Sequence, residues 1–219
     1  MNSSWWVANY LEHAPALLVS QVVWVIGSIC LHELAHGWAA IRHGDDTPIV
    51  TGHMTWSPLV HMGPWSLLMF AVVGIAWGLM PVNPSRMRGR HAEAVVALAG
   101  PAMNIALATL SIVLGGIWVS YGEFAGPALY ENFRTFFVAG VYLNLILAVF
   151  NLLPVPPLDG SRILAHYVPR YRNLIRDPRA QTVSLILFLI VFFNAGEYIW
   201  GPAIDAAVTS IEFVGDILP

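Results

Sequence analysis

The chain has 219 residues, of which 57% are hydrophobic and 11% are charged, with a net charge of −3 and a mean hydropathy of +0.65. This composition departs from that of soluble globular domains and predicts an integral membrane protein. All ten basic residues are arginine, and the chain has no basic run that could follow a phosphate backbone, which argues against a nucleic-acid partner.

Five long apolar stretches predict helices in a membrane, because about 20 apolar residues suffice to cross a bilayer and lipid offers the backbone no other partner. A weaker helical tail follows at 203–218. We expect an all-α polytopic membrane protein with five to six hydrophobic segments. Residues 1–219 would form a single domain, with a core at 14–165 and C-terminal helices at 180–218. The five stretches cover residues 14–41, 63–80, 92–120, 134–153 and 180–200.

The first apolar stretch ends in HELAH, an HExxH pattern at residues 32–36. His32 and His36 are four residues apart, so on a helix they project from one face and can bind one Zn²⁺ together. Glu33 is then placed to accept a proton from a water activated by the metal. Ionisable groups in an apolar span are costly unless paired or metal-bound, which favours a functional site over two interfacial histidines.

Residues 48–58, PIVTGHMTWSP, carry β-branched residues around Gly52 and are bounded by prolines. This pattern predicts a short β-hairpin or edge strand at the membrane surface, with an irregular loop as the alternative. His61 follows this segment and precedes the next apolar stretch. It is a candidate contact on the path by which water reaches the metal.

The third apolar stretch contains LAGPAMN at residues 98–104. Gly100 provides a narrow face for close helix packing, and Pro101 loosens the backbone ladder. Asn104 is a polar group in an apolar stretch, and Asn151 occupies a comparable position on the fourth. Either amide can bind the substrate or a tetrahedral oxyanion. Either can equally form a hydrogen bond between helices, and the sequence leaves both roles open.

A third metal ligand is expected from NLLPVPPLDG, residues 151–160. Its prolines cannot continue a helix, so the chain after the fourth span is free to bring a carboxylate oxygen of Asp159 to the metal. The alternative is an Asp-Gly turn that caps the next short helix. The residues together predict one zinc ion held by His32, His36 and Asp159.

Arginine placement predicts the orientation by the positive-inside rule, with two arginine-rich loops in the cytoplasm and acidic segments outside. To share a metal with Asp159, the first helix must run from outside to inside. Residues 63–80 must then enter and leave on one face as a re-entrant segment, and an ordinary span with an inverted first helix is the alternative. The loops hold Arg86, Arg88 and Arg90, and Arg162, Arg170, Arg172, Arg176 and Arg179.

The motifs HELAH, GPAMN and NLLPVPPLDG, in this order, resemble the site-2 protease family, peptidase family M50. The likeness covers roughly residues 17–165. It includes SPLVHMGP and MPVNPSRMR, which look like the linker of the minimal type without PDZ or CBS domains. Two positions depart from the family pattern: Gly63 stands where an acidic residue is usual, and Ser57 where asparagine is usual.

The resemblance implies an intramembrane zinc metalloprotease that uses zinc-activated water, with the residues named above as zinc ligands, acid/base and substrate- or oxyanion-binding groups. Its substrates would be transmembrane proteins, cut within or near the lipid bilayer in regulated intramembrane proteolysis. Such a substrate helix must unwind, and an edge strand at 48–58 could pair with it by β-augmentation. The enzyme would lie in a prokaryotic cytoplasmic (inner) membrane with its active site towards the cytoplasm.

A metal transporter or channel that passes ions through the His/Asp site is the alternative function. It would carry exchangeable metal and would have no need of Glu33. The substrate's identity and the oligomeric state are not predicted by the sequence.

Overall fold

The computed structural model describes residues 5–194 and 196–218, and within these ranges the protein is helical and contains no strand. Three described helices are long and apolar enough to cross a membrane: α2 (Pro15–Arg42), α6 (Ala92–Tyr121) and α7 (Pro127–Leu152). The 3₁₀ helix η2 (Gly122–Ala125) continues α6. The predicted all-α membrane fold is confirmed, whereas the expected five to six hydrophobic segments are not.

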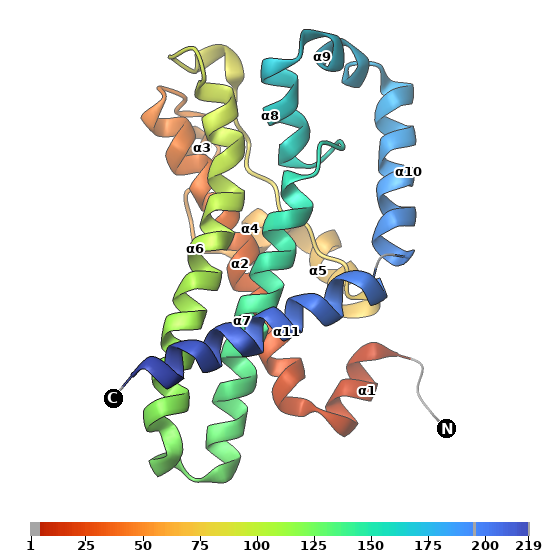
Figure 1. The fold of residues 1–219 in the computed structure, drawn as a ribbon. Coiled ribbons are helices and arrows are strands. Elements are labelled where there is room, and N and C mark those ends of the chain that lie inside the picture. The colour runs from red at the N-terminus through yellow and green to blue at the C-terminus, as the bar shows by residue number, and fades with distance from the viewer. Residues whose placement is uncertain (1–4, 195, 219) are drawn as a thin grey trace.

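Helices α2, α6 and α7 pack into a bundle in which α6 and α7 are antiparallel and joined by a short connection (Figure 1). Gly140 of α7 allows this close approach, because a Cβ there would lie 2.5 Å from both Ser111 Oγ and the Trp24 ring. Trp24 Nε1 also donates a hydrogen bond to the Phe136 carbonyl, which fastens α2 to α7.

Helix α11 (Gly196–Ile217) lies across α6 and α7, and α10 (Pro178–Asn194) precedes it at the side of the molecule (Figure 1). A Cβ at Gly116 would lie 2.4 Å from Val214, so this glycine allows α11 to pack closely against α6. These two helices replace the predicted stretch 180–200 and tail 203–218, and residue 195 lies outside the described residues. The core that α7 and α11 share consists of Ala139, Val141, Tyr142, Leu143, Ile146, Ala207 and Ile211.

The β-hairpin or edge strand predicted for residues 48–58 is wrong. Two single-turn helices, α3 (Thr47–Val50) and α4 (Pro58–His61), stand there and are separated by turns. Each helix begins with a proline in its first turn, where proline is favourable, and the Asp45 carboxylate accepts a hydrogen bond from the Thr47 amide. The prolines and this local hydrogen bond therefore outweigh the β-branched pattern, and the proposed strand pairing with a substrate fails with it.

The apolar stretch 63–80 folds back on itself. It forms the short helix α5 (Gly63–Val73), which ends at Gly74 with φ of 83°, and the chain then returns without regular secondary structure. The Leu79 amide donates to the His61 carbonyl at 2.9 Å, so both ends of the stretch lie together. The preceding helix α1 (Trp6–His13) packs at the far end of α5, where the Trp5 indole donates to the Ala71 carbonyl.

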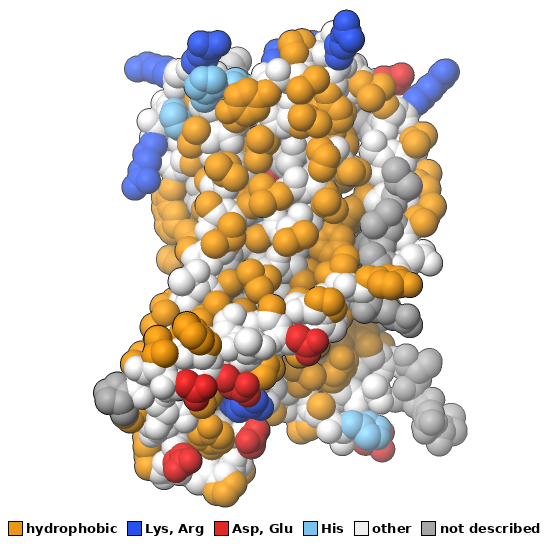
Figure 2. Space-filling view, viewed as in Figure 1, with side chains coloured by type: hydrophobic (Ala, Val, Ile, Leu, Met, Phe, Trp, Pro, Cys, Tyr) orange, Lys and Arg blue, Asp and Glu red, His pale blue; other side chains and the backbone are white. Residues whose placement is uncertain are grey.

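Charge is separated along the bundle. Figure 2 shows arginines at one end, acidic side chains near the other, and a hydrophobic surface between them. The arginine end is built from α8 (Asp159–Tyr167), α9 (Pro169–Ile175) and the loop with the 3₁₀ helix η1 (Pro84–Arg86). This is the surface expected of helices that sit in a bilayer with both ends in water.

Asp45 fastens the loop after α2 to the chain that returns from α5. Its carboxylate is fully buried and accepts hydrogen bonds from the Thr47 amide at 3.0 Å, the Thr47 hydroxyl and the Asn83 amide at 2.6 Å. Burial raises the pKa of Asp45, but these hydrogen bonds outweigh it and hold the pKa below its ordinary value. The ionised form is therefore the one that the fold stabilises.

We expect Asp45→Asn to lower the free energy of unfolding in detergent by about 1–3 kcal/mol at pH 7, because its amide would face the Asn83 N–H. Since folding lowers the pKa of Asp45, its contribution is complete above the unfolded value near 4 and declines as pH falls through the folded value. Denaturant unfolding at pH 7 and at pH below 4 measures both effects. Asp46→Asn is the control, because Asp46 is exposed where it pairs with Arg86. Equal loss in both variants would contradict this role of Asp45.

Candidate metal centre

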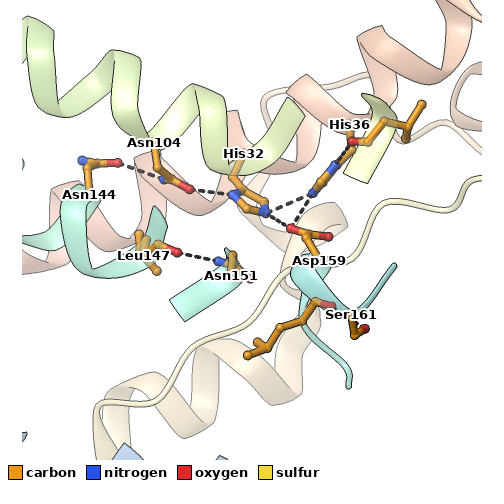
Figure 3. Close-up of polar contacts among 10 residues, drawn as sticks. His32, His36, Asn104, Asn144, Leu147, Asn151, Asp159 and Ser161 are labelled. Atoms are coloured by element: carbon orange, nitrogen blue, oxygen red, sulfur yellow. Dashed lines mark hydrogen bonds and ion pairs between the residues drawn. The ribbon is translucent and has the colours of Figure 1, made fainter. Parts of the chain in front are cut away.

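The bundle brings together, from two helices, three side chains that could hold a metal ion. His32 and His36 lie one turn apart on α2, and Asp159 begins α8 after the cluster of prolines (Figure 3). Asp159 Oδ2 lies 3.1 Å from His32 Nε2 and 3.2 Å from His36 Nε2, and the two Nε2 atoms are 3.0 Å apart. All three side chains are buried.

The hydrogen bonds on the far side of each imidazole decide which nitrogen carries the proton. His36 Nδ1 lies 2.7 Å from the carbonyl oxygen of Val96, which can only accept, so Nδ1 is the donor. His32 Nδ1 lies 2.6 Å from Asn104 Oδ1, likewise an acceptor. In the neutral rings both Nε2 atoms are therefore unprotonated, and their lone pairs face Asp159.

This donor set fits zinc. Two imidazole nitrogens and a carboxylate oxygen at such short separations repel one another, and a cation bound by all three removes the repulsion. Two histidines and one carboxylate are a known ligand set of catalytic zinc, and they leave a fourth position open. Gly100 of α6 leaves the space, since a Cβ there would lie 2.4 Å from His36 Nε2 and 2.5 Å from His32 Nε2.

Glu33 lies next to these ligands, beneath the chain that returns from α5. Its side chain is buried, and a Cβ on Gly78 would lie 2.4 Å from Glu33 Oε1, so glycine is needed where the returning chain crosses it. The arrangement places a proton acceptor at the edge of the three-ligand group.

The other predicted residues differ in their surroundings. Asn104 is fully buried and contacts His32, whereas Asn151 donates to the Leu147 carbonyl of its own helix at 2.9 Å (Figure 3). His61 is buried, and its Nε2 bonds to the Thr55 carbonyl at 2.6 Å. The structure thus brings Asn104 to the candidate metal ligands and holds His61 at the end of α4, just before α5.

One residue connected to this centre was not predicted from the sequence. Asn144 of α7 is fully buried, and its Oδ1 accepts a hydrogen bond from Asn104 Nδ2 at 2.9 Å. The signal was present, because Asn144 interrupts an apolar helix and stands four residues after Gly140, one turn away on the same face. The Val96 carbonyl, which orients His36, could not be found from side-chain patterns.

Comparison with known families gives a match to peptidase family M50 over residues 20–128 and 114–194. The chain belongs to this family. Among curated proteins, this M50 chain is 34% identical over 206 residues to "Putative zinc metalloprotease YwhC" of Bacillus subtilis, and the match covers 93% of the chain and 94% of YwhC. No solved structure matches the chain.

Two further relatives have similar names. The M50 chain is 29% identical over 194 residues to the zinc metalloprotease homologue Rip2 of Mycobacterium tuberculosis, covering 83% of the chain and 69% of Rip2. It is 27% identical over 158 residues to MJ0611 of Methanocaldococcus jannaschii, covering 72% of the chain and 75% of that protein. The predictions of the family, of a metalloprotease and of zinc as its cofactor are confirmed, and the transporter alternative is not favoured.

Proposed function

We propose that this M50 protein is an intramembrane zinc metalloprotease whose ligands are His32, His36 and Asp159. The observation that carries the proposal is the convergence of three buried donor atoms, 3.0–3.2 Å apart, inside an apolar bundle. Buried ionisable groups are costly in such surroundings unless a metal or a partner compensates them, and these three face one another directly. Glu33 completes a centre suited to peptide hydrolysis.

The division of roles follows from the geometry. Zinc, when bound, supplies Lewis acidity and lowers the pKa of water to about 7. Glu33 supplies none of the three proposed ligand atoms, so its carboxylate is free to accept a proton from water and pass it to the leaving amine. Asn151, half-buried at the end of α7, is the proposed group that binds the substrate backbone or the oxyanion.

We propose that α2, α6 and α7 span a prokaryotic cytoplasmic (inner) membrane and that residues 63–80 re-enter it. The arginine-rich end would face the cytoplasm, and the metal centre lies nearer that end, where α2 finishes and α8 begins. The whole chain, 1–219, would act as one protease domain. His61, tied to Leu79 beside the segment that covers Glu33, stays the candidate contact on the water path.

We propose transmembrane proteins as the substrates. The centre lies between apolar helices whose outer surface suits lipid, so a peptide that reaches it must come from within or near the bilayer. A substrate helix has its carbonyls engaged in its own hydrogen bonds, and a segment of it must unwind before attack. Cleavage of such a segment is regulated intramembrane proteolysis.

Removal of Asp159 tests the proposal. We expect the purified protein to carry one zinc per chain, and we expect Asp159→Ala to lose both the zinc and the cleavage of labelled single-span membrane proteins in liposomes. Metal analysis and gel assays measure these outcomes. Asp205→Ala, on an exposed site of α11, is the matched control. Full zinc content in Asp159→Ala would refute the ligand set.

A further inference from the structure

A chain of hydrogen bonds runs from His32 through the centre of the bundle (Figure 3). His32 Nδ1 lies 2.6 Å from Asn104 Oδ1, Asn104 Nδ2 lies 2.9 Å from Asn144 Oδ1, and Asn144 Nδ2 lies 2.9 Å from the Gly140 carbonyl. It joins α2, α6 and α7, and both asparagines have 0% exposure. No solvent can therefore replace a partner along it.

The Gly140 carbonyl, at the end of this series of hydrogen bonds, decides which group donates and which accepts in each of them. The Gly140 carbonyl can only accept, so Asn144 must turn its amide N–H towards it and its Oδ1 towards Asn104. Asn104 must then donate to Asn144 and present its own Oδ1 to His32. Facing an acceptor, His32 must carry its proton on Nδ1, which leaves the Nε2 lone pair for a metal.

We propose that Asn144 is a positioning residue, which acts through Asn104 to fix His32 in the tautomer that binds zinc. The inference rests on the ligand set proposed above. Without Asn144, the Asn104 amide can turn over and offer its N–H to His32 Nδ1. The proton of His32 would then move to Nε2, which could no longer act as a ligand. Second-layer partners of zinc ligands commonly act in this way.

The decisive measurement is the zinc dissociation constant, obtained in detergent by competition with a chelator. We expect Asn144→Leu to weaken zinc binding about 10–100-fold relative to wild type, the usual effect of losing such a partner. Gln21→Leu is the matched control, because it removes another hydrogen bond between α2 and α7, from Gln21 to Tyr142, that does not lead to His32. It should keep the wild-type constant, and thermal melting of the apoproteins verifies that both variants fold.

A double-mutant cycle separates positioning from packing. If Asn144 acts through Asn104, then Asn144→Leu should change the zinc constant less than about twofold when Asn104→Ala is already present. An equal loss in both backgrounds would overturn the proposal, and so would wild-type affinity in Asn144→Leu.

A second variant keeps the test open if leucine prevents folding. Asn144→Ser can still bond to the Gly140 carbonyl but cannot reach Asn104, so it should show the same loss of affinity. Wild-type affinity in Asn144→Ser would overturn the proposal. A wild-type protein that binds no zinc would instead refute the ligand set itself, so the two failures are distinguishable.

Discussion

Glu33→Gln should lower the rate of substrate cleavage by about 10²–10⁴-fold and leave the zinc content at its wild-type value. Glutamine has nearly the same size as glutamate, so it fits the space against Gly78. It cannot accept a proton from water, and it leaves in place the three proposed ligand atoms, which belong to His32, His36 and Asp159. Cleavage of a labelled single-span protein in liposomes, together with metal analysis, measures both quantities.

The same variant separates a protease from an ion pathway. Passage of metal ions through the His/Asp group needs no proton acceptor at Glu33. An ion pathway therefore predicts that metal transport is unchanged in Glu33→Gln. Glu93→Gln is the control, because Glu93 is an exposed glutamate in the first turn of α6. Wild-type cleavage by Glu33→Gln would exclude Glu33 as the general base.

The proposed metal centre was predictable because the sequence patterns that indicate it are local. The four-residue spacing of His32 and His36 places them on one helix face whatever the tertiary fold. The prolines before Asp159 end α7 where the third ligand is needed. Only the meeting of His32 and Asp159, 127 residues apart in the sequence, had to be inferred, and the structure places His32 Nε2 3.1 Å from Asp159 Oδ2.

The errors arise where short-range and long-range contacts compete with a simple pattern. Residues 48–58 have β-branched side chains, but the Asp45 hydrogen bonds and the prolines favour single helical turns. The stretch 63–80, predicted as re-entrant rather than as a full span, is apolar throughout, and Gly74 in a left-handed conformation ends its helix after eleven residues. Asn144 contacts Asn104, 40 positions before it, and Gly78 lies against Glu33, 45 positions before it. Sequence spacing does not reveal either contact.

Gly100→Ala should strongly weaken zinc binding while preserving the fold. The added Cβ would lie 2.4–2.5 Å from the Nε2 atoms of His36 and His32, too close for any van der Waals contact. The imidazole rings can rotate away more easily than α6 can move, so the donor atoms separate from Asp159 and the bundle remains. We expect the zinc dissociation constant to rise about 100-fold or more, with cleavage lost in proportion.

Gly27→Ala is the matched control for this prediction, since it makes the same change inside α2, where a Cβ would meet no atom within 4 Å. Alanine favours a helix over glycine by about 1 kcal/mol, so this variant should melt at the same or a higher temperature and keep its zinc. Chelator competition and thermal melting compare the two proteins directly. Wild-type zinc affinity in Gly100→Ala would mean that the two histidines do not bind the ion through Nε2 beside α6, and the ligand geometry would have to be abandoned.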